Sequence, residues 1–219
     1  MELLLYLVTD PALTKGRPLL AEVAAALSGG VTAVQLRDKL AAPRELLAMG
    51  AEMRRIVRQH QATFLVNDRP DMALALEADG VHLGLEDFPP GEARRLLPRP
   101  QILGVSAANV HEARAAEESG ADYLGVGPVF SSRTKPDAGE PLGLEVLASI
   151  AASVSIPVVG IGGITLESAA SVIEAGAIGI AVISAVMGAP DPAEAAHALR
   201  ARVEAARSRG GTGTRPGEA

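Results

Sequence analysis

The sequence predicts an α/β protein with the fold of a single (β/α)8 barrel, also called a TIM barrel. Short apolar runs alternate with alanine-rich amphipathic segments along the chain, a pattern typical of parallel strands joined by helices. Eight such pairs are found, which is the number that closes this barrel. The length of 219 residues is sufficient for one large domain of this kind.

Strands are expected where short runs of Val, Ile and Leu occur, and helices where apolar residues recur at helical spacing. In chain order, the expected strands cover residues 3–8, 33–36, 63–66, 80–83, 102–105, 123–126, 157–161 and 178–183. The helices that follow them are expected at residues 19–27, 43–59, 72–77, 91–97, 110–119, 144–151, 166–174 and 192–207. We expect residues 1–207 to form the catalytic barrel domain. Residues 208–219 are rich in Gly, Arg and Ser and are expected to form a disordered tail.

Glycine marks several junctions between a helix and the next strand. Gly30, Gly80, Gly120 and Gly176 each lie where a helical pattern ends and an apolar run begins. Glycine ends helices readily because it adopts the left-handed conformation without steric cost. An open, doubly wound sheet is the alternative fold, but the segment 160–163 is too short for its dinucleotide-binding fingerprint.

Composition excludes several classes of function. Aromatic residues are only 2% of the chain and the net charge is −6, which argues against a surface for nucleic acid. The absence of cysteine excludes disulfides and thiolate zinc sites, and a cytoplasmic location is expected. The N-terminus lacks the pattern of a signal peptide, and no apolar run is long enough to span a bilayer. The oligomeric state is left open, and a homo-oligomer is compatible with the sequence.

Functional residues are expected at the carboxyl ends of the strands, where barrels of this type place their active sites. After the second strand, alternation directs Gln35, Arg37 and Lys39 to the same side, which brings one amide and two cations to the barrel mouth. The alternative is a strand that ends in solvated charges.

Two carboxylates follow the third and fourth strands. Asp68 and Asp87 would lie on adjacent strand ends, and Mg²⁺ commonly binds one or two carboxylates together with water and phosphate oxygens. Each could instead cap a helix, and Asp68 before Arg69-Pro70 suits that role. The nearby Asp71 and Glu86 are interpreted as charges at helix starts.

The remaining strands end in groups suited to anions. Ser106, after the fifth strand, could donate to an oxyanion or cap the helix that begins near Asn109. Gly162 and Gly163 after the seventh strand, with Ser184 after the eighth, match the phosphate-binding region common in these barrels. The alternative is a pair of tight turns that need glycine for their backbone shape alone.

The loop after the sixth strand, residues 127–137, carries hydroxyl and cationic side chains together. Ser131, Ser132, Thr134 and Lys135 are donors suited to a transferring phosphate or a departing diphosphate. By contrast, His82 lies within the fourth strand and is interpreted as a core residue with its hydrogen bonds satisfied. The site is therefore expected to hold two anions, with Mg²⁺ and cations at one half and a phosphate-binding turn at the other.

The chain resembles the thiamine-phosphate synthase family over residues 3–185. The segments that carry the resemblance are Tyr6-Leu7-Val8-Thr9-Asp10, Val34-Gln35-Leu36-Arg37-Asp38-Lys39, Leu65-Val66-Asn67-Asp68-Arg69, Gly80-Val81-His82-Leu83-Gly84, Leu103-Gly104-Val105-Ser106, the loop at 127–138, residues 156–164 and Ala181-Val182-Ile183-Ser184-Ala185. The resemblance implies that hydroxymethylpyrimidine diphosphate loses diphosphate and that the nitrogen of hydroxyethylthiazole phosphate then attacks. The products are thiamine phosphate and diphosphate.

The resemblance also implies roles for individual residues. Those implied to hold the pyrimidine diphosphate are Gln35, Arg37, Lys39 and Asn67. Asp68 and Asp87 would hold Mg²⁺, and Ser106 and Lys135 would contact the diphosphate. Arg37, Ser106 and Lys135 are the expected catalytic residues. The thiazole-phosphate half would comprise Ser132, Thr134, Gly162, Gly163, Ile183 and Ser184.

The sequence departs from the family pattern at a few positions. Leu85 stands where Gln is usual, Ser131-Ser132 replaces Pro-Thr, and Ile178 replaces a polar residue. Two alternatives stay open: a thiazole tautomerase on the same fold, and a non-catalytic paralogue that binds thiamine intermediates. Some tautomerases place a His at the position of Pro128, and proline cannot exchange a proton.

Overall fold

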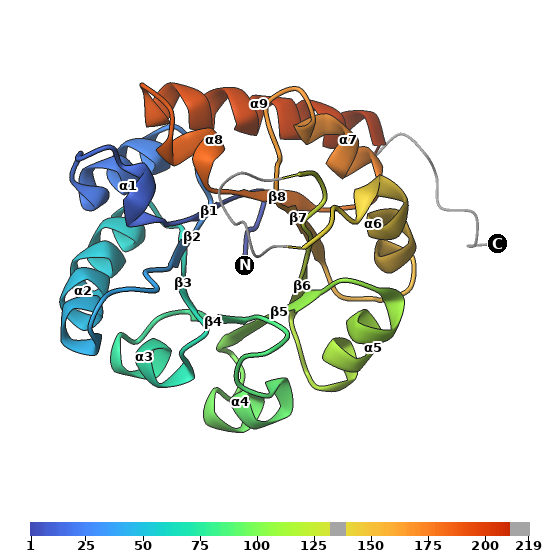
Figure 1. The fold of residues 1–219 in the computed structure, drawn as a ribbon, viewed down its shortest axis with the longest axis horizontal. Coiled ribbons are helices and arrows are strands. Elements are labelled where there is room, and N and C mark those ends of the chain that lie inside the picture. Colours follow the sequence, from blue (N-terminus) through green and yellow to red (C-terminus); the bar gives the residue numbers. More distant parts are fainter. Residues whose placement is uncertain (132–138, 211–219) are drawn as a thin grey trace.

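The computed structural model describes residues 1–131 and 139–210, and its strands close into one parallel barrel in sequence order (Figure 1). The strands are β1 Leu5–Val8, β2 Ala33–Leu36, β3 Thr63–Asn67, β4 Gly80–Leu83, β5 Ile102–Ala107, β6 Tyr123–Val126, β7 Val158–Ile161 and β8 Gly179–Val182. Strand β1 pairs with β8 as well as with β2, which removes both sheet edges. The predicted (β/α)8 barrel is confirmed.

Helices surround the barrel on its outside (Figure 1). They are α1 Leu19–Ser28, α2 Pro43–Gln59, α3 Pro70–Ala75, α4 Pro90–Leu96, α5 Val110–Glu118, α6 Gly143–Ala151, α7 Ala169–Glu174, α8 Ser184–Met187 and α9 Pro192–Gly210, with a 3-10 helix η1 at Pro11–Leu13. Neither η1 nor α8 is among the helices predicted from the sequence. Helix α9 continues through Gly210, so Ser208 and Arg209 are helical where a disordered tail was expected. Residues 211–219 lie outside the described residues.

Alternate residues of each strand enter two different cores. Ala33, Leu65 and Val159 pack inside the barrel, whereas their neighbours Val34 and Val66 pack between the sheet and the helices. This two-residue alternation follows from the pleat of a strand. Because both faces are covered, the strands are mostly apolar, and the polar residues Gln35, His82 and Ser106 are exceptions within them.

The amino-terminal end of the barrel is held by carboxylates that accept backbone hydrogen bonds. Asp79 Oδ2 accepts from the N–H of Phe64 at 2.7 Å, and Asp122 Oδ2 accepts from the N–H of Leu103 at 2.8 Å. Asp122 also pairs with Arg94. These bonds join two of the αβ loops to the neighbouring strands. Barrels of this type place the functional site at the opposite, carboxyl-terminal end.

Candidate functional site at the carboxyl ends of the strands

The ends of β1 and β2 are joined at the mouth through Arg37. Its Nη1 donates to Asp10 Oδ2 at 3.1 Å, and its backbone N–H donates to Thr9 Oγ1 at 2.9 Å. Both side chains of the ion pair are largely shielded from solvent. Thr9 and Asp10 were not among the predicted site residues, although they directly follow a strand and therefore carry the same positional signal as Arg37.

Asp68 and Asp87 lie side by side, as predicted, and they interact unfavourably while both are charged. Burial raises the pKa of Asp68 to about 6, and a hydrogen bond and charge repulsion from Asp87 contribute in the same direction. Asn67 and Lys39 oppose this shift of the Asp68 pKa, so both lie close to its carboxylate. Four of the predicted residues are thus brought together at the ends of β2, β3 and β4.

The backbone at Asp68 supports this placement. Its φ is +61°, in the left-handed region that non-glycine residues rarely adopt, and its N–H donates to the carbonyl of His82 at 2.8 Å. Such strain persists where the surrounding structure enforces it, often at functional sites. The bond across to β4 is what brings Asp68 toward the loop that carries Asp87.

The alternative role of the two carboxylates as helix caps is wrong. The N-cap position of α3 is occupied by Arg69 and that of α4 by Pro89. Asp87 Oδ2 instead accepts from the N–H of Gly84 at 2.7 Å within its own loop. Asp71, by contrast, is a first-turn charge of α3 as predicted, and its hydrogen bond from Arg69 lowers its pKa.

Gln35 and Ser106 face the barrel interior rather than open solvent. Gln35 is only 3% exposed, and its Nε2 donates to the hydroxyl of Tyr6 at 2.6 Å. Ser106 Oγ lies 3.1 Å from Nε2 of His82. Ser106 does not cap α5, because Asn109 fills that position and accepts from the N–H of Glu112 at 3.0 Å.

His82 has partners on both ring nitrogens, in agreement with its interpretation as a satisfied residue. Nδ1 lies 2.9 Å from the hydroxyl of Tyr123, and Nε2 faces Ser106. Tyr6 and Tyr123, which sequence reasoning missed, are therefore part of the same polar group. The one signal in the sequence was their position inside predicted strands, because a tyrosine hydroxyl buried in a barrel needs a hydrogen-bond partner.

The end of β7 packs closely against the segment that follows β6. Gly163 has a φ of +66°, and a Cβ there would lie 2.5 Å from the carbonyl oxygen of Ser131. The N–H of Phe130 donates to the carbonyl of Gly162 at 3.0 Å. Close backbone approach is therefore one reason for these glycines, in addition to any contact with phosphate.

The β8 end places Ile183 and Ser184 at the start of α8, with Ile183 as the capping residue. Ser132, Thr134 and Lys135 lie outside the described residues. The two halves of the predicted site thus both lie at the carboxyl ends of strands, one around β2 to β5 and one around β7 and β8.

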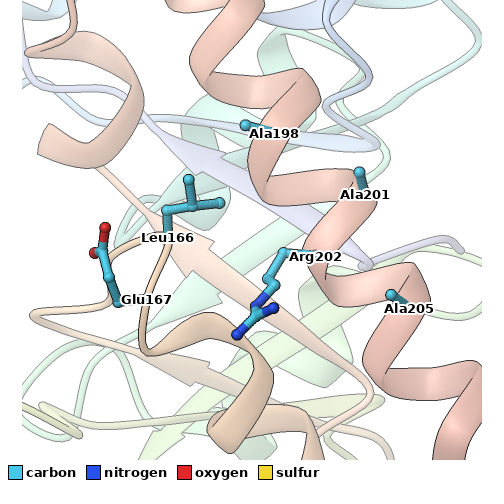
Figure 2. A pocket seen from close by; sticks show the side chains of 6 residues that line it. All are labelled: Leu166, Glu167, Ala198, Ala201, Arg202 and Ala205. Atoms are coloured by element: carbon cyan, nitrogen blue, oxygen red, sulfur yellow. The ribbon is translucent and has the colours of Figure 1, made fainter.

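A separate hollow of about 490 Å³ lies on the outer surface between the β7–α7 connection and α9 (Figure 2). Its lining comprises Leu166, Glu167, Ala198, Ala201, Arg202 and Ala205, none of which is a predicted site residue. Glu167 Oε2 accepts from Thr165 Oγ1 at 2.7 Å within its own loop. This hollow is therefore distinct from the barrel mouth.

Comparison with known proteins identifies the family. The family model described as thiamine monophosphate synthase matches residues 5–186, which is most of the chain. The chain belongs to the thiamine monophosphate synthase family. A thiamine-phosphate synthase of Moorella thermoacetica is 55% identical over 205 residues, which cover 94% of this chain and 98% of that protein. One of Roseiflexus sp. is 50% identical over 93% of this chain and 86% of its own length.

A solved structure of this family shows the same architecture. Thiamine phosphate pyrophosphorylase from Pyrococcus furiosus matches with a TM-score of 0.87 and 47% sequence identity. The match covers 93% of this chain and 96% of that one. In the part of the chain described here, no helix is long and apolar enough to cross a membrane.

Proposed function

We propose that this chain is a thiamine-phosphate synthase, a transferase that joins hydroxymethylpyrimidine diphosphate to hydroxyethylthiazole phosphate and releases diphosphate. The observation that carries the proposal is the agreement between relatives of that name at 50–55% identity over nearly the whole chain and the carboxylate pair beside cations at the barrel mouth. The substrates are small molecules, and no role for nucleic acid or a membrane is proposed.

Mg²⁺ is the proposed metal, and Asp68 and Asp87 would hold it. Two adjacent carboxylates that repel each other are suited to a divalent cation, which removes the repulsion that raises the Asp68 pKa. Among residues 1–131 and 139–210, no three acidic, His or Cys side chains gather into a metal site. Water and diphosphate oxygens would complete the coordination, and the metal would supply neutralisation of charge on the leaving group.

The protein's own residues would stabilise the departing diphosphate and orient the pyrimidine. Arg37, held by Asp10, and the exposed Lys39 supply positive charge at the end of β2. Gln35 would orient the pyrimidine ring from the barrel interior. Ser106 would donate a hydrogen bond to a diphosphate oxygen as negative charge develops there. Lys135 is proposed to act on the same group from the β6–α6 loop.

The thiazole phosphate is proposed to bind at the other half, near Gly162, Gly163, Ile183 and Ser184, with Ser132 and Thr134 from the loop. This arrangement would place the thiazole nitrogen opposite the pyrimidine methylene. Diphosphate departure before attack is the proposed order, because the mouth offers cations and donors for a leaving group rather than a positioned base.

Incubation of the protein with Mg²⁺ and both substrates tests the function. Chromatography should show thiamine phosphate and diphosphate, with no isomerisation of thiazole carboxylate phosphate. Rapid isomerisation without thiamine phosphate would favour the tautomerase, and substrate binding without any product would favour the non-catalytic paralogue. The cytoplasmic location stays a prediction, and the oligomeric state stays open.

A further inference from the structure

A continuous chain of hydrogen-bonded side chains crosses the interior of the barrel. Nε2 of Gln35 lies 2.6 Å from the hydroxyl of Tyr6, which lies 3.0 Å from the hydroxyl of Tyr123. That hydroxyl lies 2.9 Å from Nδ1 of His82, whose Nε2 lies 3.1 Å from Oγ of Ser106. This hydrogen-bonded chain of side chains draws on five strands, β2, β1, β6, β4 and β5. It links Gln35 to Ser106, the two residues in it that are expected to contact substrate.

The barrel interior is shaped to hold these rings. A Cβ on Gly104 would lie 2.2 Å from Cζ of Tyr123, and a Cβ on Gly125 would lie 2.8 Å from Cε1 of His82. The two tyrosine rings meet edge to face with centroids 6.2 Å apart. Two interior positions on β5 and β6 therefore lack side chains where the rings of Tyr123 and His82 need space.

One direction of donation continues the bond from Gln35 along this hydrogen-bonded chain to Ser106. Gln35 donates to Tyr6, whereas either partner can donate in the Tyr6–Tyr123 and Tyr123–His82 contacts. In the direction that continues the Gln35 bond, Tyr6 donates to Tyr123 and Tyr123 donates to Nδ1 of His82. Neutral His82 then carries its proton on Nε2 and donates it to Ser106. Burial raises the pKa of both tyrosines, so both keep the protons that this direction requires.

At the last member of these hydrogen-bonded side chains, the direction of donation decides how the Ser106 hydroxyl is oriented. Since Ser106 Oγ accepts from His82, its own proton is available to a second partner at the mouth. In the reverse direction the Ser106 proton would be given to His82, and lone pairs would face the mouth. Diphosphate oxygens only accept hydrogen bonds at neutral pH, so the direction decides whether Ser106 attracts or repels them.

We propose that Tyr6, Tyr123 and His82 are positioning residues that hold the Ser106 hydroxyl as a donor toward the leaving diphosphate. They also couple Ser106 to the amide orientation of Gln35. A pyrimidine amino group that donates to Oε1 of Gln35 keeps Nε2 on Tyr6, so binding of the correct ring favours the productive direction. The inference rests on the proposed function, because it assigns Ser106 to the diphosphate and Gln35 to the pyrimidine.

The tautomer of His82 is the direct test of direction. Nitrogen-15 NMR of the ring, assigned by the signal lost in His82→Asn, should show Nε2 protonated and Nδ1 unprotonated in the wild-type protein. In Tyr123→Phe the preference should weaken, because Nδ1 loses its donor. An Nδ1-protonated ring in the wild-type protein overturns the proposal, whether or not the protein is a synthase.

A double-mutant cycle tests whether Tyr123 acts through Ser106. Tyr123→Phe should lower kcat about tenfold in the wild-type background, as loss of one hydrogen bond at the transition state does. In the Ser106→Ala background the same change should alter kcat less than about twofold, since no hydroxyl remains to be oriented. An equal loss of kcat in both backgrounds overturns the proposal.

The matched control is Thr32→Val, which removes another buried hydroxyl. Thr32 Oγ1 accepts from the N–H of Leu5 at 3.1 Å and has no bond to the chain of side chains described above. It should lower the melting temperature without lowering kcat. If Ser106→Ala retains full turnover, the assignment of Ser106 to the diphosphate fails and the positioning role falls with it. If Ser106→Ala is impaired and Tyr123→Phe is not, only the positioning role fails.

Discussion

Asp68 combines two features that oppose folding and that would suit the proposed cation. Its backbone is in the left-handed region, and its carboxyl lies against Asp87 in a half-buried position. Each feature has a cost, and a strained, like-charged pair is more useful as a ligand than as a stabilising contact. At the scale of the residue, these costs to stability support the proposed metal-binding role of Asp68.

Asp68→Ala and Asp87→Ala are each expected to lower turnover at least about a hundredfold, as loss of a major transition-state electrostatic contact does. Steady-state assays across a range of Mg²⁺ concentrations measure this effect. Asp71→Ala is the matched control, because Asp71 pairs with Arg69 on an exposed surface. Normal turnover with normal Mg²⁺ dependence in both site variants would contradict the metal assignment.

Asp87→Asn is expected to stabilise the metal-free protein near neutral pH while lowering activity. The pKa of Asp68 is about 6 in the folded protein against 3.8 as its ordinary value. Between these values the folded state binds more protons than the unfolded state, so the free energy of unfolding falls as pH rises through this window. Removing the Asp87 charge lowers the Asp68 pKa, so the folded protein regains part of the free energy of unfolding that it loses as pH rises.

Melting curves in EDTA measure this effect on stability. The variant should melt at a higher temperature than the wild type near neutral pH, and the gain should shrink near pH 3, where Asp68 is largely protonated in the folded and the unfolded state. A gain of equal size at both pH values would assign the effect to a change in packing.

At the scale of the element, the turn after β7 is built on contact with the segment after β6. The N–H of Val129 donates to the carbonyl of Ile161 at 2.8 Å, which continues the strand pairing beyond β6. Gly162 and Gly163 follow at once, and neither leaves room for a Cβ. These glycines therefore allow residues 128–131 to pack closely against the turn after β7.

Gly163→Ala is expected to destabilise the protein by about 1–3 kcal/mol, because the new Cβ meets two backbone carbonyls and the φ stays positive. Turnover should also fall, since Phe130 and Ser131 must move away from the turn after β7. Gly16→Ala is the control, with a φ of +84° and nothing within 4 Å of the new Cβ. Equal losses of stability in the two variants would show that the backbone angle, and not the contact, causes the effect.

At the scale of the whole molecule, α9 closes the ring of helices against the N-terminal part of the chain. Ala196, Leu199 and Val203 are fully or nearly fully buried, and Arg200 Nη1 donates to the carbonyl of Gly30 at 3.0 Å. Ala206 is also buried, and the residues after it, 207–209, are exposed and include Arg209, which pairs with Glu174 at 3.6 Å.

Removal of residues 211–219 is expected to leave turnover and the melting temperature unchanged, because α9 keeps its buried contacts. Truncation after Arg207 should cost at most about 1 kcal/mol, the usual upper value for an exposed ion pair. Thermal melts and assays of both truncated chains check this. Loss of folding on removal of residues 211–219 alone would show that the barrel needs them.

Local pattern was sufficient to predict the barrel and the strand ends, because both depend on short-range periodicity. The expected bounds of β2, β4 and β6 and of α2 agree with the structure residue for residue. Where prediction differed, a local contact explains it. Helix α7 begins at Ala169 rather than at residue 166, since Ser168 Oγ accepts from the N–H of Thr165 at 2.9 Å and holds a turn there.

Placement at strand ends also located Gln35, Arg37, Asp68, Asp87 and Ser106, since parallel strands bring their carboxyl ends to one face. The partners of these residues depend on contacts distant in sequence and needed the tertiary structure. Tyr6 and Tyr123 are 117 positions apart, and Arg37 meets Asp10 across 27. Helix α8 is similar: Arg17 and Lys15 satisfy carbonyls at its end and just beyond it from 170 to 173 positions away.

The sequence by itself determined which residues form strands and which polar groups follow them, because apolar periodicity and chain position are local properties. Only the tertiary structure decided how these polar groups are paired. Closure of the barrel brings β1 against β8 and directs Gln35, Tyr6, Tyr123, His82 and Ser106 into one interior. Hydrogen bonds need atoms within about 3 Å, and that proximity between distant segments arises only when the chain has folded.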